Sequence, residues 1–243
     1  MTDYPGLLTT EIGPGAWASY NNITPPKDYQ ISPEEGYAVS LGYNYFLPNV
    51  GNTSYQVISG LGQTYLSGGF LPDRNVIKLR AAASVSPPQN SVLYGYQQAG
   101  GEYGFFLVNQ LFIQRGYPFG EFIGHTLINA NFEYRFPLGY PFAGSGTFPV
   151  FTEAWHMALV ADALTLDGGY YDSSTTPSPL RVTKLGTVYV GTGAELKGNF
   201  QILYGWDVMF KFGVYYGLTA NAYGGPNIQF GFWKRVVNAD FPK

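Results

Sequence analysis

One arginine and two carboxylates are the residues of this chain whose types and spacing could form a buried ionic site. Arg115 lies in a loop rich in glycine and aromatic residues, QRGYPFGEFIG (114–124). Glu133 and Asp162 follow in two segments of alternating apolar and polar residues, and both fall on the polar face. A carboxylate that lines a protein interior is most stable where a guanidinium reaches it, because arginine forms charge-assisted bidentate bonds and keeps its proton. We therefore expect Arg115 to bind Glu133 and Asp162. The alternative is a solvated arginine above carboxylates that only line a wet interior.

The elements that must position these groups are β-strands, because apolar and polar residues alternate through most of the chain. Eight segments show the alternation: residues 36–46, 54–66, 75–85, 126–136, 151–166, 187–202, 206–215 and 227–232. Their polar faces carry further charges that we expect to line an interior: Lys78, Arg80, Arg135, Glu195, Lys197, Asp207 and Lys211. The last four are expected to form a solvated ladder of charges.

Composition narrows the class of β protein. Charged residues make up 12% of the chain and aromatic residues 18%, whereas soluble domains contain about 25% charged residues. Most segments are near or above the roughly 9–11 residues that a tilted strand needs to cross a bilayer. We therefore expect a transmembrane β-barrel; the alternative is a soluble β-sandwich or lipocalin-like barrel with a ring-lined pocket. The length suits one barrel domain, residues 36–243, with a long extracellular loop at about 87–124, after a Gly/Pro-rich segment at 1–35.

Several classes of function are disfavoured. No window approaches the roughly 18 consecutive apolar residues of a membrane-spanning helix, and the mean hydropathy is −0.06. The chain has no cysteine and a net charge of −3, so we expect no disulfide, no thiolate metal site and no nucleic-acid partner. His125 and His156 lie on different segments and no serine occupies a recognisable nucleophile position, so we expect no metal, no cofactor and no enzyme activity. The amino terminus MTDYPGLLTTEIGPG lacks the basic start and apolar core of a signal peptide, so an exported protein would begin here in its mature form.

A family resemblance rests on the residues around Arg115. Arg115-Gly116-Tyr117 is followed by Pro118, Phe119, Gly120 and Gly124, and then by NFEYRFPLG (131–139). This order resembles the carboxy-terminal barrel of the bacterial surface antigen family, the BamA and TamA type of outer-membrane assembly and translocation barrel, over about residues 36–237. The resemblance implies that Arg115, Gly116 and Tyr117 form the tip of an extracellular loop that folds back into the barrel. It also implies that Glu133 and Asp162, the latter in VADALTLDGG (160–169), are its partners on the wall.

The resemblance implies that this chain supplies the last eight strands of a sixteen-stranded barrel in the bacterial outer membrane. Phe230, Phe232 and Trp233 resemble the aromatic terminal strand that such barrels present for assembly, although KRVVNADFPK follows. Residues 1–35 are too few for the periplasmic domains that handle substrates in this family. The insertase role of the family is therefore not simply implied for this chain.

The length of the loop leads to an expectation about partners. An eight-stranded barrel has an interior just wide enough for side chains, so it cannot hold such a loop. Open sheet edges are not tolerated in lipid. We therefore expect a homodimer, or a second chain, to complete a wide barrel in outer-membrane lipid; the alternative is a closed eight-stranded barrel with the loop outside. We expect an assembly or translocation barrel, and the alternative function is a structural or pore-forming barrel.

Overall fold

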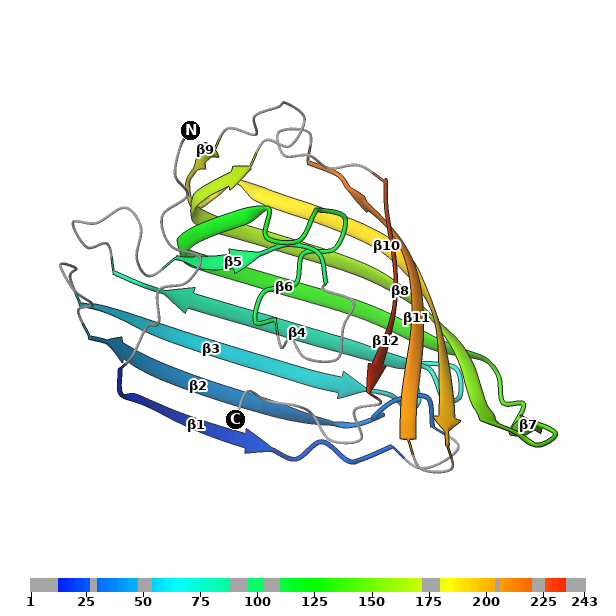
Figure 1. The fold of residues 1–243 in the computed structure, drawn as a ribbon. Helices are drawn as coiled ribbons and strands as arrows, with labels where there is room; N and C mark the ends of the chain where they lie inside the picture. The colour runs from blue at the N-terminus through cyan, green and yellow to red at the C-terminus, as the bar shows by residue number, and fades with distance from the viewer. Residues whose placement is uncertain are drawn as a thin grey trace.

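The structure is a computed structural model that describes residues 13–26, 30–47, 54–87, 96–102, 110–171, 180–203, 206–219 and 226–234. Its strands form one twelve-stranded antiparallel sheet (Figure 1). Nine of them follow one another across the sheet: β1 (Gly15–Asn21), β2 (Gly36–Phe46), β3 (Tyr55–Leu66), β4 (Val76–Val85), β6 (Phe122–Gly139), β8 (Phe148–Tyr171), β10 (Val188–Ile202), β11 (Trp206–Gly217) and β12 (Pro226–Lys234). The short strands β5 (Gln97–Ala99), β7 (Ala143–Ser145) and β9 (Leu180–Thr183) pair with β6, β8 and β8. The predicted all-β antiparallel class is confirmed, and no helix of the described ranges has the length and apolar character to span a membrane.

The strand count differs from the prediction of about eight. The ninth strand of the continuous path is β1, which lies inside the 1–35 segment that the sequence analysis placed before the barrel domain. Its sequence, GAWASYN, has no charge and mixes small and aromatic residues on both faces, so the alternation is too weak to reveal it. Strand β1 forms because all seven of its residues pair with β2.

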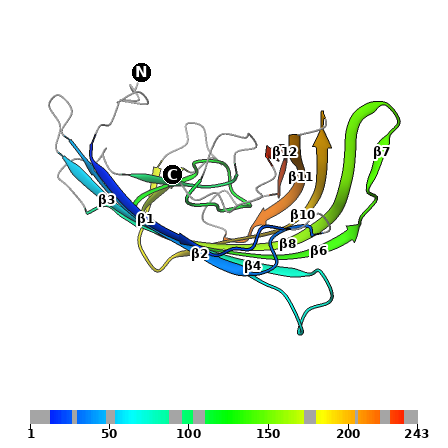
Figure 2. The same cartoon turned by 90° about the horizontal axis from the view of Figure 1, so that it is seen from below.

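The sheet is strongly curved but not closed. Figure 2 shows it as a trough, with β5 and the segment that leads into β6 lying on the concave side. Among the described strands, β1 pairs only with β2, and β12 pairs only with β11. A closed eight-stranded barrel is therefore not the arrangement of these strands.

The two faces of the sheet have the reverse of the usual soluble pattern. On β6, the apolar residues Ile128 and Phe132 point to the convex face and are 49% and 39% exposed. The alternating polar residues Asn129 and Glu133 point to the concave face and are 0% and 8% exposed. In this stretch of β6 the convex face is thus apolar and exposed, whereas the concave face is polar and covered.

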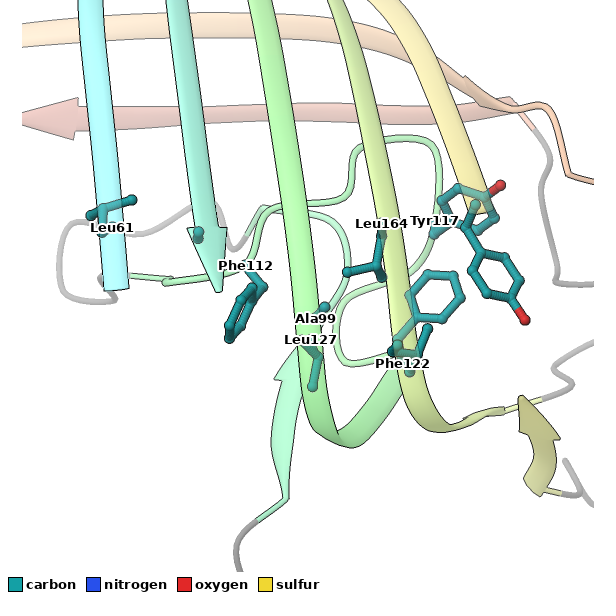
Figure 3. Packing of buried hydrophobic residues seen from close by; sticks show 10 residues of the cluster. Leu61, Ala99, Phe112, Tyr117, Phe122, Leu127 and Leu164 are labelled. Carbon is teal, nitrogen blue, oxygen red and sulfur yellow. The ribbon is translucent and has the colours of Figure 1, made fainter. Parts of the chain in front are cut away.

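The main hydrophobic cluster lies on the concave face, under the loop that precedes β6. Its buried members include Phe112 and Tyr117 from the loop and Phe122, Leu164 and Tyr189 from the strands (Figure 3). The rings of Tyr117 and Phe122 are 5.1 Å apart between centroids in an edge-to-face arrangement, and those of Phe122 and Tyr189 are 4.7 Å apart. Such pairs stabilise the packing beyond the area that they bury, so this cluster fixes the loop against β6, β8 and β10.

Candidate functional site: an ionic latch on the concave face

Three neighbouring strands bring one carboxylate each to the same part of the concave face. These are Glu133 of β6, Asp162 of β8 and Glu195 of β10, and all three are buried. The strand registers place Asp162 opposite Asn131 on one side and Gly191 on the other. Because every second residue of a strand shares a face, Glu133 follows Asn131, and Glu195 follows Gly191, on the concave side.

Arg115 is the shared partner of the three carboxylates. Its Nε and Nη2 atoms donate to Asp162 Oδ2 and Oδ1 at 2.8 and 2.6 Å, which is a bidentate ion pair. Its Nη1 donates to Glu133 Oε1 at 2.9 Å and to Glu195 Oε1 at 3.0 Å. The backbone N–H of Arg115 also donates to Asp162 Oδ2 at 2.8 Å. We call this set of contacts the latch, and residues 110–121 the latch loop.

The latch is withdrawn from solvent. Arg115 is only 1% exposed, although it lies in a loop. Burial by itself lowers the pKa of its guanidinium, but the charge and hydrogen bonds of Asp162 and the charges of Glu195 and Glu133 outweigh it and hold the pKa well above its ordinary value. The guanidinium therefore stays protonated, and its fixed fork of donors is matched by acceptors on three strands.

Glycines let the latch loop approach the sheet backbone. Gly116 has a φ of +90°, in the region that favours glycine, and a Cβ there would lie 2.7 Å from the backbone nitrogen of Gly217 on β11. At Gly191 on β10, a Cβ would collide with the carbonyl oxygen of Arg115. A side chain at either position would therefore push the latch loop off the wall.

Tyr117 completes the contact between the loop tip and β10. It is fully buried, and its hydroxyl donates to the carbonyl oxygen of Val190 at 3.0 Å. The same hydroxyl accepts a hydrogen bond from the backbone N–H of Thr219 at 3.3 Å. Each residue of the Arg115-Gly116-Tyr117 sequence thus makes a different kind of contact with the wall: ionic, close backbone approach, and aromatic with a polar end.

Further residues of the wall hold the carboxylates in place. Arg135 Nε and Nη2 donate to Glu133 Oε2 at 2.8 and 2.5 Å. Lys197 Nζ lies 2.6 Å from Glu195 Oε2 and 3.5 Å from Glu133 Oε2. The hydroxyl of Tyr215 donates to Glu195 Oε1 at 2.7 Å. Each glutamate therefore shares its two oxygens between Arg115 and a group of the wall.

Hydrogen bonds between side chains and backbone carbonyl oxygens also join the latch loop to the wall. Arg80 Nη2 donates to the carbonyl oxygens of residues 110 and 111 at 2.9 and 2.6 Å. Asn131 Nδ2 donates to the carbonyl oxygen of Ile113 at 2.7 Å and to Asp162 Oδ1 at 2.8 Å. Gln114, also fully buried, donates from Nε2 to the carbonyl oxygen of Tyr189 at 3.0 Å. Arg80 and Asn131 thus hold the loop backbone to the wall, and Gln114 holds the loop to the backbone of β10.

The structure joins the residues that the sequence grouped, and it adds others. Arg115, Glu133 and Asp162 are in direct contact. Glu195 was predicted only as a charge of the interior, but it is a third ligand of Arg115. Gln114 was not singled out at all. Its place directly before Arg115 in the sequence is the feature that could have pointed to its role.

The prediction of a solvated charge ladder is wrong for three of its four members. Glu195, Lys197 and Lys211 are 1%, 4% and 4% exposed, because the loop covers them, and each is ion-paired. Asp207 is half-buried, and among the described residues no ion pair joins it to the latch. Lys78 is half-buried, with its Nζ 5.8 Å from the centre of the Tyr65 ring.

The predicted terminal aromatic strand corresponds to β12. Phe230 is 73% exposed on the convex face. Phe232 and Trp233 lie opposite Phe210 and Met209 of β11, and their side chains are outside the described part of the structure. The aromatic strand is therefore an edge of the described sheet.

No metal site competes with this interpretation in the described ranges, where no group of three or more metal-binding side chains occurs. His125 stacks on Tyr96 with ring centroids 4.1 Å apart, whereas His156 is buried elsewhere, opposite Lys197. No family model, curated protein or solved structure matches the chain.

Proposed function

We propose that this chain is part of an outer-membrane β-barrel of the assembly or translocation type, whose interior is occupied by the latch loop. The observation that supports this best is Arg115, buried at 1% exposure and bound by carboxylates from three adjacent strands. A loop that is fixed by one ionic centre can be seated or released as a whole. Such a loop suits a barrel that must be sealed at rest and opened to a passing polypeptide or lipid.

The faces of the sheet support a location in lipid. The convex face exposes large apolar side chains from most of the strands, including Leu41, Ile58, Leu79, Leu159 and Val214. Monomeric soluble proteins rarely expose contiguous apolar patches of more than a few hundred Å². An apolar outer face around a polar interior is the arrangement of transmembrane barrels.

The open edges support a partner. Unpaired backbone groups in hydrocarbon cost several kcal/mol each, so β1 and β12 require strands from a second copy of the chain or from another chain. Nine successive antiparallel strands make β1 and β12 run in the same direction, so two copies joined edge to edge would form eighteen strands with parallel seams. Native mass spectrometry of the detergent-solubilised particle distinguishes one copy of the 26.7 kDa chain from two.

A structural or pore-forming barrel is the second candidate, and the completeness of the ion pairing favours it. Every carboxylate of the latch is paired with a cation from the wall or the loop. A plug that is stabilised so fully suits a permanent seal as well as a gate. The difference between the candidates is whether the latch loop leaves during function.

The test compares wild-type protein with Arg115→Ala in liposomes, with Arg181→Ala on β9 as the matched control because Arg181 is exposed. An assembly barrel accelerates the insertion of an unfolded outer-membrane barrel protein, measured as protease protection, and Arg115→Ala alters that rate. A pore gives steady conductance in planar bilayers that Arg115→Ala increases, with no effect on insertion. A protein that stays monodisperse without detergent would contradict both and would indicate a soluble ligand-binding barrel.

A further inference from the structure

The described residues before the latch loop are bonded to it. We call residues 96–102 the loop base. The backbone N–H of Gly101 donates to the carbonyl oxygen of Pro118 at 3.1 Å, and that of Gln114 donates to the carbonyl oxygen of Gly100 at 2.7 Å. Gln110 Nε2 also donates to the carbonyl oxygen of Gly101 at 3.2 Å. The loop base and the latch loop therefore form one hydrogen-bonded unit, which we call the plug.

The loop base contacts strands that the latch does not reach. The carboxylate of Glu102 forms an ion pair with Lys211 of β11, and Lys211 is only 4% exposed. Gly101 packs against β12, where a Cβ on Gly101 would lie 2.7 Å from Gln229 Nε2. The latch holds the plug to β6, β8 and β10, whereas Glu102 and Gly101 hold it to β11 and to the edge strand β12.

The carboxylate of Glu102 offsets the repulsion between two lysines on neighbouring strands. Lys211 lies directly opposite Lys197 on β10, and two like charges in that position repel each other. Lys197 is neutralised by Glu195 at 2.6 Å, whereas the nearest Glu195 oxygen to Lys211 Nζ is 3.7 Å away. Among the contacts described here, Glu102 is therefore the carboxylate nearest to Lys211 while Arg115 occupies Glu195.

Two ionic groups of the plug, one of each sign, form ion pairs with the groups of the wall described above. The wall supplies three carboxylates, Glu133, Asp162 and Glu195, and three cations that pair with carboxylates, Arg135, Lys197 and Lys211. The plug adds Arg115 and Glu102. Among these ion-paired groups, the wall is therefore balanced both with the plug and without it.

We propose that Glu102 and Lys211 form a second latch of opposite polarity, which couples the seating of the plug to the order of the β11–β12 edge. When the plug leaves, Arg115 and Glu102 leave together, and Lys211 takes the Glu195 oxygen that Arg115 vacates. Release is then an exchange of ion pairs that leaves both Glu195 and Lys211 paired on the wall. This rests on the proposed function only in taking the plug as the part that moves.

The test is hydrogen–deuterium exchange of the full chain in detergent micelles, read by mass spectrometry. Glu102→Gln is expected to speed exchange about tenfold in the loop base, β11 and β12, because it leaves Lys211 without its carboxylate in a buried site. Lys211→Gln is expected to affect the same regions. Glu35→Gln is the matched control, since Glu35 is exposed and lies before β2, and it is expected to leave β11 and β12 unchanged.

The double variant Arg115→Ala/Glu102→Gln tests the exchange of ion pairs. Each single change removes a buried charge of one sign, whereas the double change removes one of each sign. The fall in melting temperature of the double variant is therefore expected to be smaller than the sum of the two single falls.

Two results would overturn the second latch: β11 and β12 exchange in Glu102→Gln as they do in Glu35→Gln, or the two falls in melting temperature simply add. A different result would contradict the role of the first latch and leave the second latch untouched. If Arg115→Ala leaves exchange in residues 110–121 unchanged while Glu102→Gln acts as expected, the proposed function loses its support and the second latch stands.

Discussion

The concave and convex faces of β6 show how one strand serves two environments. Asn129, Asn131 and Glu133 point into the concave face and are buried with polar partners. Ile128 and Phe132 alternate with them and are exposed without any polar partner on that face. In a soluble sheet the apolar residues would be buried and the polar ones exposed. In this part of β6, burial therefore follows the loop that covers the concave face and not the hydrophobicity of the residues.

The largest expected effect comes from removing Arg115, which binds three carboxylates on the concave face. Arg115→Ala leaves three carboxylates, Glu133, Asp162 and Glu195, short of a cation in a covered site. Breaking a buried ionic cluster in this way destabilises a protein by about 3–5 kcal/mol. The free energy of unfolding in detergent, measured by denaturant titration, checks this, with Arg181→Ala as control. Equal stabilities of the two variants would mean that the carboxylates are solvated and that the latch does not stabilise the fold.

The next effect tests the convex face. Ile128→Lys places a charge where the side chain is 49% exposed. In a bilayer a lysine at the midplane of the lipid face costs about 2–4 kcal/mol, whereas at the surface of a soluble protein the change stays within about 0.5 kcal/mol. Val182→Lys on β9 is the control, because Val182 is 80% exposed on a short strand away from the main path. Unfolding titrations in liposomes measure both, and equal stabilities would argue against a lipid-facing convex surface.

The sequence was sufficient to predict eight of the nine strands of the main path and their two faces, because alternation is a local property of each segment. It was also sufficient to propose Arg115, Glu133 and Asp162 as partners, since a guanidinium in a loop and two carboxylates on polar faces have few other solutions. The role of Glu195 as a ligand of Arg115 could not be predicted from the alternation of residues alone. Its height on the wall depends on the register between β8 and β10, which are separated by a long connection, and periodicity does not fix a register.

The edges of the sheet were also beyond the sequence. Strand β1 has too little contrast between its faces to be recognised, and its pairing with β2 comes from backbone hydrogen bonds that any residue except proline can make. The burial of Lys197 and Lys211 could not be predicted either, because it depends on a loop that lies far away in the sequence. Residues whose environment is set by a distant segment are those for which local patterns fail.

A smaller effect compares the same substitution on the two faces. Gly191→Ala on the concave face would force the Arg115 backbone away from β10, and overpacking of this kind costs about 1–3 kcal/mol. Gly62→Ala on β3 is the control, because a Cβ there meets no other atom within 4 Å. Limited proteolysis in detergent should cut the latch loop faster in Gly191→Ala than in Gly62→Ala. Equal cleavage rates would show that the loop is not seated against Gly191.

The smallest expected effect comes from removing the hydroxyl of Tyr117 alone. Tyr117→Phe keeps the aromatic packing on Phe122 but removes the hydroxyl that joins the carbonyl oxygen of Val190 and the N–H of Thr219. A hydrogen bond between neutral groups contributes about 0.5–1.5 kcal/mol, so a fall of that size in the free energy of unfolding is expected. Tyr216→Phe, on the exposed face of β11, should have no measurable effect. A fall as large as that of Arg115→Ala would instead mean that the hydroxyl of Tyr117 stabilises the seated loop as much as the ionic centre does.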